Sequence, residues 1–225
     1  MTNKERFIEL LRSTKREGIE KLIDFLEKTD FFVAPASTRF HMSCEGGLLQ
    51  HSLNVYDCLV SLGSAAGDVQ EFHVAGMRLD SIPKESIIIV ALLHDLCKVN
   101  FYATEMRWRK DANNKWEQYP VYAVNDRNPY GHGEKSVMMA SEFIRLTMEE
   151  RYAIRWHMGM SEANITQTYC QAAEKYPLVL FAHMADQMAT SYLETNTGNK
   201  KPEDVYLGTE PAVQDPEKFA EAEPI

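Results

Sequence analysis

Residues 87–98 read Ile-Ile-Ile-Val-Ala-Leu-Leu-His-Asp-Leu-Cys-Lys. The first seven side chains are all apolar, so this run has no polar face and suits a helix that is packed on every side. Its β-branched residues would also suit a buried strand, but Ser81-Ile-Pro is a plausible helix start and the pattern continues through His94 to Lys98. We therefore predict a helix at the centre of the domain.

This apolar helix ends in two polar residues, His94 and Asp95. Burying the Asp95 carboxylate among leucines costs free energy unless a cation neutralises it. The end of the central helix is therefore a candidate cation site.

The segments around the central helix also show helical spacing of apolar residues. Residues 3–29 indicate two short helices or one that is broken near Glu17-Gly18, and Gly46-Gly47 precedes a further helix. Later helices are expected at Ser136–Leu146, Glu149–His157 and Leu178–Leu193, the second opened by the capping box Thr147-x-x-Glu150. The fold class expected is an all-α helical bundle.

Residues 101–131 differ in composition from the rest of the chain. They are rich in tyrosine and tryptophan, and Asp111-Ala-Asn-Asn separates two alternating segments, which predicts a β-hairpin inserted between helices. The segment carries five basic residues against four acidic ones. Such a mixture can bind nucleic acid, pack on its own domain or form a dimer contact, and we leave these three alternatives open.

Length and composition indicate one globular domain with a tail. The chain has 225 residues, 44% of them hydrophobic and 25% charged. We assign residues 1–195 to the domain, with 101–131 as the hairpin insertion. Residues 196–225 form an acidic tail with four of the nine prolines and seven acids against three lysines, a composition that does not fold alone.

The charge excludes long-range capture of polyanions. The net charge is −9, so no global field attracts nucleic acid or anionic lipid. The apolar runs are too short to cross a bilayer and the N-terminus does not resemble a signal peptide, so we expect a cytoplasmic protein that does not enter the membrane. The four cysteines are widely spaced and contain no Cys-x-x-Cys pair, which indicates free thiols.

Five of the seven histidines lie on or beside predicted helices, about one helix and one connection apart. Their spacings are 43, 38, 25 and 26 residues, so neighbouring antiparallel helices can bring them to a common centre, where metal sites in bundles are built. These five are His51, His94, His132, His157 and His183, the last followed by Asp186. His73 has no such context, and we interpret it as structural.

These motifs resemble the HD-domain metal-dependent phosphohydrolases, whose pattern is His, His-Asp, Asp on a helical bundle. The resemblance is closest to the HD domain of bacterial 3′-5′ exoribonucleases and covers about residues 31–193. It rests on the segment from Ala34 to His51 and on four motifs: Leu92-Leu-His-Asp-Leu-Cys-Lys98, Gly131-His-Gly-Glu-Lys-Ser136, Trp156-His-Met-Gly159 and Ala182-His-Met-Ala-Asp186.

Two departures from that exoribonuclease pattern stand out. Those enzymes carry an oligonucleotide-binding barrel ahead of the HD domain. The thirty helical residues at the start of this sequence cannot form such a barrel, so we do not expect tight binding of long RNA. The second of the family's paired histidines is Met158 here, a soft thioether that matches a hard cation poorly.

The resemblance implies a ligand set for one or two divalent transition-metal ions. A first ion would be bound by His51, His94, Asp95 and Asp186, and Asp95 would bridge to a second ion at His132 and His157. Imidazole and carboxylate donors suit Mn²⁺, Fe²⁺, Co²⁺, Ni²⁺ or Zn²⁺.

The resemblance also implies catalytic roles for Asp95 and Lys98. Lys98 lies one turn after His94, where it would reach a substrate phosphate or simply complement the helix dipole. Further candidate substrate contacts are His41, Lys135 and His183, with a buried structural role as the alternative for His183.

The function expected is metal-dependent hydrolysis of a phosphoester bond in a nucleotide or short nucleic acid. The substrate would be a small phosphorylated molecule or a short oligonucleotide, and a homo-oligomer is possible. Two alternatives stay open: an HD-type mixed-valent di-iron oxygenase, and a non-catalytic metal- or nucleotide-binding module.

Overall fold

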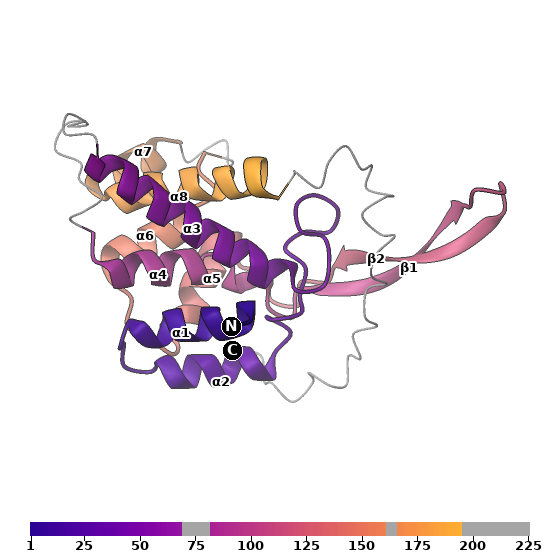
Figure 1. The fold of residues 1–225 in the computed structure, drawn as a ribbon, viewed down its shortest axis with the longest axis horizontal. Helices are drawn as coiled ribbons and strands as arrows, with labels where there is room; N and C mark the ends of the chain where they lie inside the picture. Colours follow the sequence, from indigo (N-terminus) through magenta and orange to yellow (C-terminus); the bar gives the residue numbers. More distant parts are fainter. Residues whose placement is uncertain (69–81, 161–165, 195–225) are drawn as a thin grey trace.

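A computed structural model describes residues 1–68, 82–160 and 166–194 of the chain. In these ranges the protein is mostly helical, with one two-stranded antiparallel sheet (Figure 1). The α-helices are α1 (Asn3–Ser13), α2 (Ile19–Lys28), α3 (Gly47–Asp68), α4 (Lys84–Leu93), α5 (His132–Ser141), α6 (Met148–Trp156), α7 (Thr166–Lys175) and α8 (Pro177–Met188). The 3₁₀-helix η2 (Leu96–Lys98) follows α4, the π-helix η3 (Ala189–Leu193) follows α8, and the strands are β1 (Tyr102–Lys110) and β2 (Trp116–Val124).

Helix α4 lies at the centre of the bundle, as the apolar run predicted. Its residues Ile88 to Leu93 are buried without a break, and the helix contacts α1, α3, α6 and α8. Because these helices pack around one apolar rod, the polar residues at the C-terminal end of α4 lie where several helix ends meet.

The predicted break between the first two helices is confirmed. Thr2 and Glu5 form a capping box at the start of α1, and Gly18 precedes α2 with a φ of 89°. A Cβ at Gly18 would overlap the carbonyl oxygen of Phe143, so both the backbone conformation and the close approach require glycine.

Several helix boundaries differ from the predictions. Helix α4 ends at Leu93 instead of continuing to Lys98, because the chain turns at Asp95 into η2. Helix α5 begins at His132 and ends at Ser141, and α8 changes to π-helix at Ala189. Helix α7 was not predicted, since its sequence is mostly polar and Tyr169 is its only large buried side chain among the described residues.

The predicted β-hairpin is confirmed, and it extends away from the helices (Figure 1). Its two nine-residue strands pair from Tyr102 opposite Val124 to Lys110 opposite Trp116. At the tip, the Asp111 carboxylate accepts hydrogen bonds from the backbone N–H groups of Asn113 and Lys115, and Asn114 adopts a φ of 61°.

Two sequence predictions lie outside the described residues: the acidic tail at 196–225 and the assignment of His73. Among the helices that the structure does describe, none combines the length and the apolar character that a membrane span requires.

Candidate metal centre

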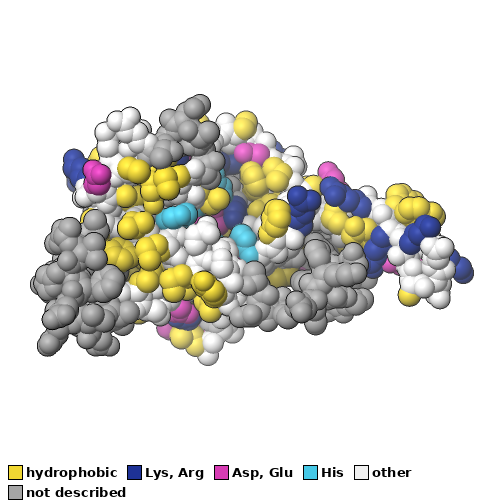
Figure 2. Space-filling model, turned by 90° about the horizontal axis from the view of Figure 1, so that it is seen from above, with side chains coloured by type: hydrophobic (Ala, Val, Ile, Leu, Met, Phe, Trp, Pro, Cys, Tyr) yellow, Lys and Arg dark blue, Asp and Glu magenta, His cyan; other side chains and the backbone are white. Residues whose placement is uncertain are grey.

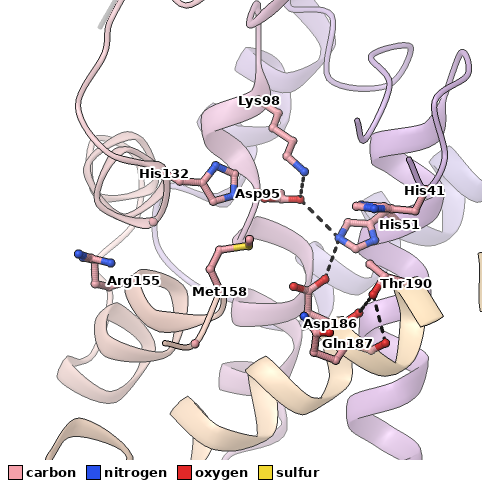
Figure 3. A pocket seen from close by; sticks show the side chains of 12 residues that line it. His41, His51, Asp95, Lys98, His132, Arg155, Met158, Asp186, Gln187 and Thr190 are labelled. Atoms are coloured by element: carbon pink, nitrogen blue, oxygen red, sulfur yellow. Dashed lines mark hydrogen bonds and ion pairs between the residues drawn. The ribbon is translucent and has the colours of Figure 1, made fainter. Parts of the chain in front are cut away.

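The six predicted metal ligands come from five separate parts of the fold and meet at one place. Figure 3 shows His51, Asp95, His132 and Asp186 of this set. His51 lies on α3, His94 and Asp95 lie at the end of α4, and Asp186 lies on α8. The other two are His132 at the start of α5 and His157 at the end of α6. Apart from His132, all of them are buried.

One group of donor atoms gathers around Oδ2 of Asp95. The Nε2 atoms of His51 and His94 are 3.1 Å apart, and each is 3.4 Å from Asp95 Oδ2. Asp186 Oδ1 is 3.3 Å from His51 Nε2. These four residues are the set that the resemblance assigned to a first ion.

A second group lies on the other oxygen of the same carboxylate. Asp95 Oδ1 is 2.8 Å from His132 Nε2 and 3.6 Å from His157 Nε2. The imidazole rings of His132 and His157 are neighbours, with ring centroids 5.1 Å apart. Asp95 thus stands between two sets of imidazoles and faces each with a different oxygen.

Helix ends orient two of these imidazoles. His94 and His157 each follow the last residue of a helix, and each places Nδ1 within hydrogen-bond distance of the carbonyl three residues earlier, Ala91 at 2.9 Å and Ile154 at 2.7 Å. Carbonyls in the last turn of a helix have no partner within the helix, so they are available for this bond. With Nδ1 held there, Nε2 of each ring is directed to the common centre.

A carboxylate that the sequence analysis missed orients His51. Glu194 Oε1 is 2.9 Å from His51 Nδ1 and also accepts a hydrogen bond from Asn54 Nδ2 at 3.0 Å. The Glu194 side chain is fully buried. No local pattern pointed to it, because Glu194 follows the last predicted helix and one more acid is inconspicuous in an acidic chain.

The carboxylates of the centre are held ionised. Burial alone would lower the pKa of His51, but the carboxylates of Asp186, Asp95 and Glu194 outweigh it and raise that pKa. Burial opposes ionisation of Asp95 as well, yet nearby Lys98 and the surrounding histidines keep the pKa of Asp95 well below its usual value. The site therefore presents carboxylates that are ready to accept a cation.

Two glycines explain how helix ends can approach so closely here. A Cβ at Gly133 would overlap the backbone of Arg155, so Gly133 lets the first turn of α5 lie against the end of α6 and brings His132 near His157. A Cβ at Gly159, which has a φ of 65°, would strike the ring of His183.

The donor atoms fit a bound divalent ion. Ligands about 2.1 Å from one ion, at angles between about 90° and 109°, lie roughly 3.0–3.4 Å from one another. The donor atoms of His51, His94 and Asp95 show this spacing, and Asp186 Oδ1 lies at a similar distance from His51 Nε2. Among the described residues, the buried Nε2 of His157 has no hydrogen-bond partner, and the buried Oδ1 of Asp95 has only its close contact with His132. Buried polar atoms normally have a partner, and a cation would supply it.

A cavity of about 370 Å³ opens beside the metal ligands. Figure 2 shows histidine side chains exposed on this face, next to acidic and basic ones. Two predicted substrate contacts, His41 and Lys98, line the cavity, as does Met158. The lining also contains residues that the sequence analysis did not single out, namely Gly133, Arg155, Gly159, Gln187 and Thr190.

Lys98 is tied to the centre by its ammonium group. Its Nζ donates to Asp95 Oδ2 at 2.6 Å and to the carbonyl of Ala36 at 2.7 Å. An ammonium group has three donors, so a third N–H is left for a ligand in the cavity.

His41 forms another part of the cavity wall. Its Nε2 is buried without a hydrogen-bond partner among the described residues, and its ring centroid is 4.9 Å from that of His51. Burial lowers the pKa of His41 to about 4, and the neighbouring His51 and Lys98 act in the same direction. The ring is therefore a neutral imidazole near pH 7, and it can hydrogen-bond to a ligand.

Two predicted substrate contacts lie outside the cavity lining. Lys135 donates to Asp126 Oδ1 at 2.7 Å and lies over the ring of Phe101. His183 Nδ1 is 2.7 Å from the carbonyl oxygen of His157. In this structure His183 supports the backbone at His157, a predicted metal ligand, which agrees with the structural alternative.

Comparison with known proteins supports one family. Residues 48–191, well over half of the chain, match the model of the HD domain. No curated protein and no solved structure matches the chain. The family match covers all six predicted metal ligands, and HD domains bind divalent metals. The chain therefore belongs to the HD-domain family, within the superfamily of metal-dependent phosphohydrolases.

Proposed function

We propose that this protein hydrolyses a phosphoester bond in a nucleotide or a short oligonucleotide, with one or two divalent transition-metal ions as cofactor. The observation that carries the proposal is the position of Asp95. Its Oδ2 faces His51 and His94, and its Oδ1 faces His132 and His157. A carboxylate shared in this way suits two ions that act on one phosphoryl group.

The residues around the carboxylate have distinct roles in this proposal. His51, His94, Asp95 and Asp186 would hold one ion, and Asp95, His132 and His157 the other. When bound, such an ion supplies an activated water and polarises the phosphoryl group. Lys98 fixes the Asp95 carboxylate and offers its remaining N–H to a phosphate oxygen, while the neutral His41 imidazole hydrogen-bonds to the substrate.

The cavity favours a small substrate. Its volume of about 370 Å³ lies at the lower end of the range for small-molecule sites, about 300–1,000 Å³. That space accommodates one nucleotide or the end of a short chain. We therefore propose short substrates over long RNA.

Cationic side chains favour phosphate chemistry over the oxygenase alternative. Lys98 and Arg155 both line the cavity. Arg155 forms an ion pair with Glu134, and its guanidinium lies 4.1 Å from the centroid of the Trp156 ring. Guanidinium and ammonium groups beside a metal centre neutralise the charge that develops on a transferred phosphoryl group.

The test is a screen of phosphomonoesters, phosphodiesters, nucleotides and short oligonucleotides with Mn²⁺, Co²⁺ or Ni²⁺. We expect hydrolysis by the wild type and loss of at least about 1,000-fold in His94→Ala and Asp95→Asn. Asp24→Asn, an exposed aspartate on α2, is the matched control and keeps full activity.

The same screen separates the alternatives. Wild-type activity in both site variants overturns the proposal. Oxygen consumption by the iron-loaded protein without phosphoester hydrolysis assigns it to the oxygenases. Tight nucleotide binding without turnover under any of the metals assigns it to the binding modules.

A further inference from the structure

The β-hairpin has one apolar face and one charged face. Residues that pair directly across the strands lie on the same face, and so do alternate residues along each strand. The register therefore gathers Met106, Trp108, Trp116 and Pro120 on one face, which we call the tryptophan face. Its opposite face carries four charged residues, Glu105, Arg107, Arg109 and Glu117.

The tryptophan face is unusually exposed. Trp108 is 61% accessible, Trp116 is 65% accessible and Met106 is 55% accessible. The sheet has only these two strands, so nothing in the described part of the chain extends it at either edge. A lone two-stranded hairpin is marginally stable in water, and exposed apolar patches of this kind mark interaction surfaces.

The charges on the two faces decide what the tryptophan face binds. A single-stranded nucleic acid would need cations beside the stacking rings. Two of the arginines lie on the opposite face from the tryptophans, and Arg109 is engaged there by Glu117 at 2.6 Å and by the ring of Tyr119. Lys110 is the one charged residue on the tryptophan face between 104 and 122, and its Nζ lies 5.6 Å from the ring centroid of Trp116.

We propose that the tryptophan face is a dimerisation surface that packs against the same face of a second copy of this chain. The apolar residues of this face can pack against the same residues of a second copy across a two-fold axis. Lys110 is exposed at the turn end of β1, so its ammonium can stay in water at the edge of the contact, and Gln118 is the other polar residue beside the tryptophans. The charged face then remains in water on both copies. This inference does not depend on the proposed activity.

The area available predicts a reversible dimer. Two indoles about 60% exposed contribute roughly 300 Å² per copy, and Met106 with Pro120 brings the face to roughly 450 Å². Two copies together bury roughly 900 Å², close to the lower limit for a specific interface. We therefore expect a dimer that dissociates in the micromolar range.

Sedimentation velocity of the full chain between about 1 and 100 µM tests this proposal. We expect the wild type to pass from monomer to dimer over this range and Trp108→Ser/Trp116→Ser to remain monomeric, a weakening of at least 10-fold. Glu105→Ser/Arg107→Ser is the matched control, since it changes two exposed residues on the opposite face, keeps the net charge and should dimerise like the wild type.

A further variant and measurements of folding distinguish loss of the dimer from misfolding of the variant. Trp108→Glu sets carboxylates against each other across the two-fold axis and should also remain monomeric. Mn²⁺ binding and the helical circular dichroism signal should be unchanged in all variants, because the substituted residues lie away from the metal centre. Trp108 and Trp116 should show a blue-shifted fluorescence emission as the wild type dimerises.

Three outcomes overturn the proposal. One is a wild type that stays monomeric at about 100 µM. Another is a dimer that survives both tryptophan variants, and the third is a control variant that loses the dimer equally. Binding of single-stranded DNA that is lost in Trp108→Ser/Trp116→Ser while the protein stays monomeric assigns the face to nucleic acid instead.

Discussion

Glu194 is separated from His51 by 143 residues, yet its Oε1 lies 2.9 Å from Nδ1 of that histidine. A carboxylate bonded to the far side of a ligating imidazole fixes the ring and raises its basicity. The C-terminal end of the described chain is thereby tied to the predicted metal ligand on α3.

We predict that Glu194→Gln weakens Mn²⁺ binding about 10-fold and Glu194→Ala about 100-fold, because the amide keeps the hydrogen bond and alanine removes it. Isothermal titration calorimetry on the metal-free protein measures both affinities. Glu174→Gln, an exposed glutamate on α7, is the control and should bind like the wild type. An unchanged affinity in Glu194→Ala would contradict the orienting role.

Metal stoichiometry should separate the two groups of ligands. We predict two equivalents in the wild type and one in His132→Ala, because His132 faces only Oδ1 of Asp95. Elemental analysis of protein purified without chelators and saturated with Mn²⁺ provides the count. A single equivalent in both proteins would remove His132 from the ligand set.

Lys98→Met should lower kcat/KM about 100-fold while the metal content stays at the wild-type value. The methionine removes the ammonium group that contacts Asp95 and faces the cavity, but it removes no ligand. The comparison is Lys21→Met, an exposed lysine on α2 with no part in the site. Loss of metal together with activity would show that Lys98 acts on the ligands instead of the substrate.

Ionisation of Asp30 should lower the free energy of unfolding as the pH rises. Burial raises the pKa of Asp30 from 3.8 to about 6, although its carboxylate accepts a hydrogen bond from the N–H of Asn100 at 2.7 Å. Between these values the folded state binds a proton that the unfolded state has lost, so stability falls as the pH rises from about 4 to 6. The difference between the two pKa values corresponds to at most roughly 3 kcal/mol above pH 6.

Asp30→Asn keeps an acceptor for Asn100 and cannot ionise. We therefore predict a higher melting temperature than wild type at pH 7.5 and no gain at pH 4, both measured by thermal unfolding. Asp24→Asn controls for the loss of one acid at the surface. An equal gain at both pH values would show that ionisation of Asp30 is not the cause.

The parts of the fold that the sequence predicted have strong local patterns. The unbroken apolar run located α4, Gly18 located the break before α2, and the capping box at Thr147 located the start of α6. The hairpin followed from its alternation and the Asp111 turn. Helix α7 was not predicted because its sequence is mostly polar and offers few large apolar residues such as Tyr169.

At the site, the sequence identified candidate metal ligands, but it did not show which other residues contact them or line the cavity. Histidine and aspartate are chemically distinctive, so their order along the helices was informative. Arg155 and Thr190 reach the cavity, and Glu194 reaches His51, only through the packing of helices that are distant in sequence. Lys135 instead pairs with Asp126, in the segment between β2 and α5, and does not line the cavity.

The distribution of the ligands over α3, α4, α5, α6 and α8 has a further consequence for the stability of the fold. An ion at this centre cross-links helices that belong to distant parts of the chain and has no comparable site in the unfolded protein. A concentration of free ion 100-fold above its dissociation constant adds about 2.7 kcal/mol to the free energy of unfolding. Chelation should therefore lower the stability of the whole bundle, so that the supply of metal would affect the resistance of the protein to unfolding as well as the proposed activity.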